Sequence, residues 1–164
     1  MTPLSQLWPE PVQRVSAYLR AAAVDATVQE FPGGTPTARA AAEAIGCEPE
    51  LIVKSLLFVC DGAFVLALVP GDRRADERKV AAAAGAHTVR IATADEVVHA
   101  TGFEPGAVAP FPHRAVARTF VDRLLLQHAR VWIGAGTDTH MAALAPSDLQ
   151  RLAGARTADL VTHS

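Results

Sequence analysis

Two apolar runs with a turn signal between them dominate the middle of the chain. Residues 52–59 and 64–69 are rich in β-branched and large apolar side chains, and Asp61-Gly62 lies between them. Asp-Gly between two such runs is typical of a β-hairpin. The first run is apolar at both alternating positions, which indicates that both faces of the strand are covered. The pattern therefore predicts a buried hairpin.

Helical patterns occur on both sides of this hairpin. Apolar residues recur at helical spacing near the start of the chain. Thr35-Pro36 offers a capping hydroxyl followed by a proline suited to a first helical turn, and Gly46 is placed to end that helix. Thr93 and Glu96 form a capping box, which Gly102 can close. The predicted helices cover about 11–23, 35–45, 76–84, 93–101 and 147–152.

Shorter β-prone runs, at 27–31, 88–91, 115–121 and 131–134, alternate with these helices, and residues 102–112 form a loop-like stretch. No linker, internal repeat or low-complexity tract divides the chain. We therefore expect one mixed α/β (α+β) domain spanning residues 1–164, which is long enough to build a core.

The charge of the chain limits the kinds of partner that it can bind. Its formal net charge of −2 argues against a general nucleic-acid binder, and we expect no DNA partner. A local basic patch that grips one RNA end remains compatible with this balance, although a solvated face is the favoured interpretation of each cluster. The two candidate clusters are Arg73, Arg74, Arg78 and Lys79, and Arg114, Arg118 and Arg123.

The expected environment is the reducing cytoplasm. No apolar run reaches the roughly 18–20 residues that span a bilayer, so we expect no membrane partner, and residues 1–6 show no signal-peptide pattern. Cys47 and Cys60 are isolated, which gives no disulfide or metal framework. The six histidines lack ligand spacing, and we expect no metal site.

Familiar cofactor and nucleophile motifs are missing. Gly134-Ala135-Gly136 follows a predicted strand but lacks the third glycine of a dinucleotide fingerprint. The sequence contains neither a phosphate-binding Gly-x-x-x-x-Gly-Lys-Ser/Thr loop nor a Gly-x-Ser-x-Gly elbow. We therefore expect a chemistry without a cofactor.

Lys54 interrupts the first apolar run with an ammonium group. A lysine at a sheet edge that extends its amine into water is the common explanation for such a residue. Cover on both faces of the strand makes an unpaired ammonium expensive, however. The chain has only two lysines against thirteen arginines, so a lysine here is unusual. A structural and a functional role for Lys54 are about equally supported by these arguments.

The segment from Gly106 to Pro110 is the second unusual stretch. Glycine permits close backbone approach, and the proline four residues later stiffens the loop. Such a loop can aim backbone N–H groups at a developing oxyanion. A tight turn without a function is the more common explanation when Gly-x-x-x-Pro is considered alone.

Taken together, three motifs resemble the YbaK/ProX aminoacyl-tRNA deacylases, which are relatives of the editing domain inserted in bacterial prolyl-tRNA synthetases. The motifs are residues 52–58, residues 101–110 and Gly134-Ala135-Gly136, and the resemblance extends from about residue 11 to 160. It implies a mixed, curved, partly barrel-like β-sheet flanked by helices. It also implies hydrolysis of the ester between an amino acid and the terminal adenosine of tRNA.

The resemblance also assigns site residues. Lys54 would contact the phosphate, ribose or carbonyl region of the substrate, and the backbone at Gly106 would donate to the scissile carbonyl. Ser55 would lie beside them at a position that varies with substrate. The substrate-binding residues implied are Phe31, Ser55, Ala107, Val108, Pro110, Gly134, Gly136 and His140.

One segment departs from the YbaK pattern. The cysteinyl-tRNA deacylases of this family place a serine and an aspartate where this chain has Gly134 and the run 137–141. Asp138 and His140 are alternative candidates for the polar role, and an exposed loop histidine is the other interpretation of His140. This difference from the YbaK pattern argues against specificity for cysteinyl-tRNA. It does not argue against deacylation itself.

The expected function is therefore trans-editing of mischarged tRNA. The substrate would be tRNA-Pro carrying a small wrong amino acid such as Ala, Cys, Ser or Thr, and water would attack the activated ester. The partners would be the aminoacyl-tRNA acceptor end and prolyl-tRNA synthetase. The alternatives are a non-catalytic module of the same fold that binds tRNA ends or a synthetase, and an unrelated small-molecule binding protein.

Overall fold

The computed structural model describes residues 8–163, which form five α-helices and eight strands. The helices are α1 (Glu10–Ala21), α2 (Ala38–Ile45), α3 (Glu77–Ala84), α4 (Ala94–Thr101) and α5 (Pro146–Ala153), with 3-10 turns η2 (Pro49–Leu51) and η3 (Arg123–Gln127). The strands are β1 (Val28–Glu30), β2 (Val53–Cys60), β3 (Ala63–Pro70), β4 (Val89–Ile91), β5 (Arg118–Asp122), β6 (Val131–Gly134), β7 (His140–Leu144) and β8 (Ala155–Ala158).

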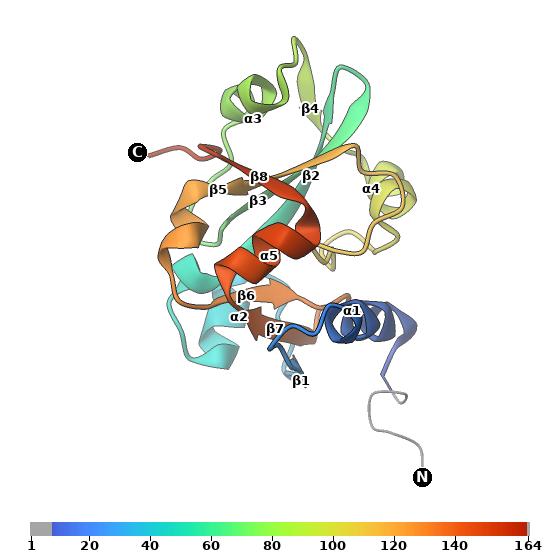
Figure 1. The fold of residues 1–164 in the computed structure, drawn as a ribbon, viewed down its shortest axis with the longest axis vertical. Coiled ribbons are helices and arrows are strands. Elements are labelled where there is room, and N and C mark those ends of the chain that lie inside the picture. Colours follow the sequence, from blue (N-terminus) through green and yellow to red (C-terminus); the bar gives the residue numbers. More distant parts are fainter. Residues whose placement is uncertain (1–7, 164) are drawn as a thin grey trace.

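The strands form two sheets. The larger one has the order β4-β2-β3-β5-β8, in which β3-β5 and β5-β8 are parallel and the remaining pairs are antiparallel. The smaller sheet, β1-β7-β6, is antiparallel and lies with α1 and α2 at the lower end of the molecule in Figure 1. An isolated bridge between Ile52 and Trp132 links the two sheets. The mixed α/β architecture is confirmed, and the strands of residues 8–163 divide into two sheets without closing into a barrel.

Side-chain alternation along β2 creates two separate cores. Val53 and Leu57 belong to the larger buried cluster, which includes residues of α1. Phe58 and Cys60 belong to a second cluster, which includes Val80 of α3. Both faces of the predicted hairpin strand are thus covered, and β2 pairs with β3 over the full length of both strands.

The sequence missed two strands and one helix cap. β7 and β8 are alanine-rich, and each pairs with a strand remote in sequence, so no local pattern marks them. Thr37, not Thr35, caps α2 by accepting a hydrogen bond from the Ala40 N–H at 3.0 Å. The hydroxyl of Thr35 is buried and donates to the backbone oxygen of Asp138 at 3.0 Å. Thr35 therefore joins the start of α2 to the β6–β7 turn.

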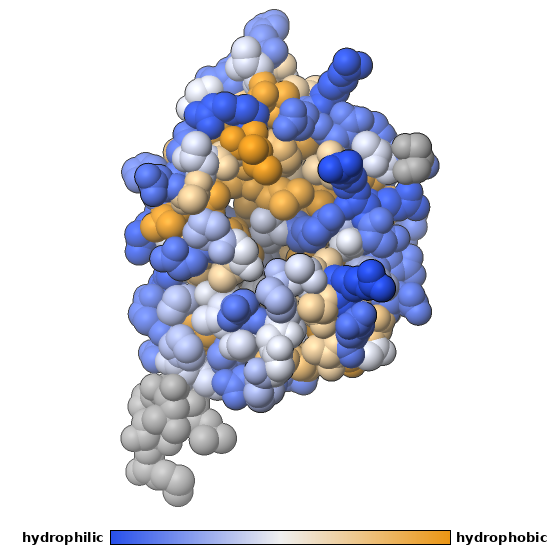
Figure 2. All heavy atoms as spheres, turned by 180° about the vertical axis from the view of Figure 1, so that it is seen from behind, coloured by the Kyte–Doolittle hydropathy of each residue, from blue (hydrophilic) through white to orange (hydrophobic). Residues whose placement is uncertain are grey.

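Hydrophobic residues gather on the face of the molecule seen from behind, where hydrophilic residues border them (Figure 2). Ile91 is the one large hydrophobic side chain of residues 8–163 that is exposed, at 61%. Within the same residues, no helix has the length and apolar character to cross a membrane.

Candidate functional site

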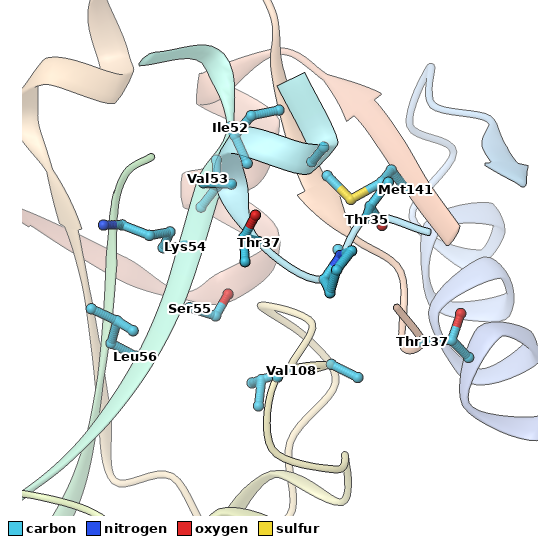
Figure 3. A pocket seen from close by; sticks show the side chains of 16 residues that line it. Thr35, Thr37, Ile52, Val53, Lys54, Ser55, Leu56, Val108, Thr137 and Met141 are labelled. Carbon is cyan, nitrogen blue, oxygen red and sulfur yellow. The ribbon is translucent and has the colours of Figure 1, made fainter. Parts of the chain in front are cut away.

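A cavity of about 300 Å³ opens where the two sheets meet the start of α2 (Figure 3). Its walls come from four parts of the chain that are distant in sequence: the segment leading into α2, the first half of β2, the loop at 106–108, and the β6–β7 region. The lining residues are Thr35, Pro36, Thr37, Ala38, Ala41, Ile52, Val53, Lys54, Ser55, Leu56, Gly106, Ala107, Val108, Gly134, Thr137 and Met141.

Six of the ten residues assigned from the sequence lie together in this wall: Lys54, Ser55, Gly106, Ala107, Val108 and Gly134. Lys54 and Ser55 are neighbours on β2, so their side chains point to opposite faces of the strand. Figure 3 shows the Ser55 hydroxyl on the side of Thr37 and Val108, whereas the Lys54 amine points away from them. Ser55 is therefore the side chain of this pair that faces the other walls.

Pairing with a backbone carbonyl explains how a lysine is accommodated in an apolar strand. The Lys54 ammonium donates a hydrogen bond to the backbone oxygen of Arg73, in the turn after β3. Burial lowers the pKa of Lys54 below the ordinary lysine value, the Asp72 carboxylate opposes this shift, and Arg74 adds to it. An ammonium has three N–H donors, and the Arg73 oxygen occupies one of them.

Gly106 and Val108 contribute backbone donors at the opposite wall. Gly106 has φ of 82°, a left-handed conformation that favours glycine, and an added Cβ there would meet no atom within 4 Å. The Ala107 N–H is already used, because it donates to the Glu104 oxygen at 2.9 Å. Within residues 8–163, the N–H groups of Gly106 and Val108 have no hydrogen-bond partner. Two N–H groups of this loop are thus available to a bound molecule.

Contacts at both ends fix the position of this loop. Arg14 of α1 donates to the Gly102 oxygen at 2.6 Å, and its guanidinium lies 4.6 Å from the centre of the Phe103 ring. The His113 Nε2 lies 2.9 Å from the Ala109 oxygen. Burial lowers the pKa of His113, which favours the neutral ring and a donated Nε2–H to that oxygen. The cavity wall is therefore held by groups outside the cavity.

Gly134 closes the cavity opposite the loop. It ends β6 with an unstrained backbone, and a Cβ built there would lie 3.7 Å from the Val108 oxygen. That separation is an ordinary van der Waals contact. A side chain at residue 134 would therefore occupy the space between β6 and the loop.

Four of the assigned residues do not line the cavity. The Phe31 ring packs edge-on against Trp132 with centroids 6.1 Å apart. Pro110 is buried in the base of the loop. Gly136 has φ of 106° and lies against the backbone of Pro11, where a Cβ would come within 2.8 Å. These three residues lie outside the lining of the cavity.

His140, the fourth, is buried at 2% exposure, so its interpretation as an exposed loop histidine is wrong. Its Nδ1 lies 2.6 Å from the Thr137 hydroxyl and 3.0 Å from that of Thr139. Its Nε2 is 3.4 Å from a Glu30 carboxylate oxygen, without hydrogen-bond geometry. Thr137 lines the cavity and His140 does not, so His140 is connected with the cavity only by its contact with the Thr137 hydroxyl. Asp138, the alternative candidate, is exposed.

The sequence-based site assignment missed the start of α2. Thr35, Thr37 and Ala38 line the cavity, and the N-terminus of α2 brings unpaired backbone N–H groups to its edge. Two hydroxyl residues flank Pro36 in the sequence, but this pattern indicates a helix start and does not by itself indicate a cavity wall. In residues 8–163 no group of three His, Cys, Asp or Glu side chains is arranged to hold a metal.

Solved structures with the same arrangement define the class of this protein as an editing-domain fold. A candidate trans-editing enzyme for prolyl tRNA synthetase superimposes with a TM-score of 0.88 at 36% identity, covering 94% of this chain and 99% of that one. The hypothetical protein APE2540 superimposes with a TM-score of 0.84 at 29% identity, covering 91% and 99%.

Sequence comparison gives the family. The model of the aminoacyl-tRNA editing domain matches residues 33–152, and the chain belongs to this family. The proline–tRNA ligase of Nitratidesulfovibrio vulgaris (strain DP4) is 36% identical over 118 residues, which are 71% of this chain and 21% of the ligase. That of Bacillus pumilus is 40% identical over 75 residues, 46% of this chain and 13% of the ligase. The chain thus spans about a fifth or less of these curated relatives.

Proposed function

We propose that this chain is a trans-editing hydrolase that cleaves the ester of mischarged aminoacyl-tRNA. The observation that carries the proposal is the cavity between Ser55 on β2 and the N–H groups of Gly106 and Val108. Its volume of about 300 Å³ is at the lower end of the roughly 300–1,000 Å³ typical of ligand pockets. A small amino acid esterified to the terminal adenosine is the substrate that family membership and this size favour. The proposed carrier is tRNA-Pro.

The proposed mechanism needs no covalent intermediate, because an aminoacyl ester is already activated. Water attacks the carbonyl carbon, the ester C–O bond breaks, and the ribose hydroxyl leaves with a proton. The free N–H groups of Gly106 and Val108 stabilise the oxyanion; losing one such donor costs roughly 100–1,000-fold in other acyl-transfer enzymes. The vicinal ribose hydroxyl assists the attack and identifies the substrate as RNA.

Lys54 provides the positive charge of the proposed site. Its ammonium has donors left after bonding Arg73, and these can bind a phosphate or ribose oxygen at the rim of the cavity. Ser55 and Thr37 contact the amino-acid moiety, and Gly134 limits its size. Editing is needed because one methylene changes binding by only about 1–3 kcal/mol, too little for a synthetase pocket to reject close analogues.

A deacylation panel tests this function. tRNA-Pro charged with alanine, cysteine, serine, threonine or proline is incubated with the protein, and the remaining ester is measured over time. We expect at least one small amino acid to be released faster than the uncatalysed background, with cognate prolyl-tRNA spared. Binding of every tRNA without release of any amino acid would instead support a non-catalytic module that holds tRNA ends.

A further inference from the structure

A basic cluster lies in the turn between β3 and α3, outside the cavity just described. Asp72, Arg73, Arg74 and Thr162 line a separate polar hollow there. The Lys54 ammonium bonds to the Arg73 backbone oxygen, so this hollow adjoins the strand that forms the cavity wall. Three cationic side chains of the described residues therefore belong to one small region.

Backbone contacts hold this turn in place. The Gly71 N–H donates to the Ile52 oxygen at 2.8 Å, and the Thr162 N–H donates to the Arg74 oxygen at 2.9 Å. A Cβ at Gly71 would lie 2.6 Å from the Pro49 oxygen and 2.7 Å from the Ala38 Cβ. The turn is thus packed against the start of α2, which is also a wall of the cavity.

The positive charge of this turn is only partly neutralised. Asp72 lies 3.9 Å from the Arg73 guanidinium, a weak and half-exposed pair. Arg74 is exposed and has no ion pair within residues 8–163. Two other carboxylates bind groups other than Arg74. Asp76 caps α3, and Asp159 forms an ion pair with Lys79 at 3.1 Å. Other exposed arginines, such as Arg78 and Arg156, also lack an ion pair in the described residues, so what distinguishes Arg74 is its place near Lys54, whose pKa it lowers.

We propose that Arg73 and Arg74 bind a backbone phosphate of the RNA strand as it leaves the cavity. This inference rests on the proposed function, which places the terminal nucleoside in the cavity and its 5′ phosphate at the rim. A guanidinium binds phosphate oxygens through two parallel N–H donors, and it keeps its charge at any working pH. Arg74 makes the principal contact because, unlike Arg73, it forms no ion pair with a carboxylate of residues 8–163.

Kinetics with two substrates test this phosphate site. Arg74→Ala is compared with Arg156→Ala, which removes the same charge from an exposed position on β8. With mischarged tRNA, we expect Arg74→Ala to raise KM about tenfold with kcat unchanged, and to lower the slope of log binding against log salt by roughly 0.7. With an aminoacyl-adenosine, which has no phosphate, Arg74→Ala and the wild type should have the same KM. Arg74→Lys should recover part of the affinity, and Arg156→Ala should match the wild type.

Binding of uncharged tRNA separates this inference from the proposed function. Fluorescence anisotropy needs no turnover, so weaker binding by Arg74→Ala supports the phosphate site even if no ester is hydrolysed. Equal affinities of Arg74→Ala and Arg156→Ala would overturn it, as would equal losses with the two substrates. An effect of Arg74→Ala only in the presence of prolyl-tRNA synthetase would indicate a protein contact and would also overturn the RNA site.

Discussion

A single hydrogen bond determines what Lys54 can do. The Arg73 backbone oxygen accepts one of the three N–H donors of the Lys54 ammonium. This hydrogen bond lowers the cost of burying Lys54 in β2, but it leaves the positive charge in place. Burial lowers the pKa of Lys54, and the positive charge of Arg74 lowers it further, whereas the Asp72 carboxylate opposes these effects. A bound phosphate or carbonyl oxygen would raise the pKa of Lys54 again, because it stabilises the charged ammonium. The residue is therefore suited to gain a negative partner.

Substitution of Lys54 tests this reasoning. We expect Lys54→Ala to reduce deacylation at least tenfold, because the charge at the rim is lost. The free energy of unfolding should change by no more than about 1 kcal/mol, since relief of desolvation offsets the lost hydrogen bond. Lys54→Arg retains the charge but widens the head group, and rescue should be poor. Activity and denaturant unfolding are measured together; full activity in both variants would remove Lys54 from the site.

Gly134 provides a purely steric test of the cavity. Gly134→Ala adds one methyl group facing the Val108 oxygen, at an unstrained backbone position. We expect the thermal midpoint to be unchanged and activity to fall most for the largest substrate in the panel. Gly33→Ala is the matched control, because its Cβ would meet nothing within 4 Å and Gly33 does not line the cavity. The same loss in both variants would contradict a size-limiting role for Gly134.

At the scale of secondary structure, turn and capping residues in the sequence predicted most of the helices and strands. Asp-Gly between apolar runs identified β2 and β3, and the capping box at Thr93 marked the start of α4. β7 could not be predicted, because its five residues lack a β-branched pattern and one of its two partners, β1, is distant in sequence. For the same reason the site was predicted only in part. Motifs located Lys54 and Gly106, but the approach of α2 to β2 depends on tertiary packing.

The cap of α2 connects helix stability with the cavity. Thr37→Ala should destabilise the protein by about 1 kcal/mol, because the Ala40 N–H loses its acceptor. Thr37→Ser keeps the cap and should restore stability. Because Thr37 also lines the cavity, Thr37→Ala should reduce activity at a temperature where the protein is fully folded. Thermal unfolding and deacylation of the two variants check this; unchanged stability in Thr37→Ala would exclude the capping role.

At the scale of the whole molecule, stability should depend on His113. Burial lowers the folded-state pKa of this ring below its ordinary value of about 6.5. Between the two values the unfolded chain binds more protons, so stability rises with pH. The contribution of His113 is complete above the ordinary value and is lost as pH falls toward the folded pKa.

A comparison of thermal midpoints at pH 5 and pH 7.5 measures this contribution. We expect the wild type to lose more stability on acidification than His113→Gln, which keeps a donor for the Ala109 oxygen but does not titrate. Carboxylates with lowered pKa values, such as Glu96 at about 2, act in the same direction in both proteins, so only the difference reports on the histidine. Identical losses would show that His113 is not the titrating group.

The bridge between Ile52 and Trp132 has a mechanical consequence. It is the one backbone ladder contact between the two sheets in residues 8–163, and Ile52 also lines the cavity. Behind it, Val53 and Leu57 of β2 share one buried cluster with Val131 and Ile133 of β6, so side-chain packing holds the two sheets together where the backbone contact ends. The width of the cavity is therefore set by the packing of this shared core as well as by the bridge. A molecule too large by one methylene would have to displace close-packed side chains to enter, so the core behind the cavity would help to limit the size of what binds.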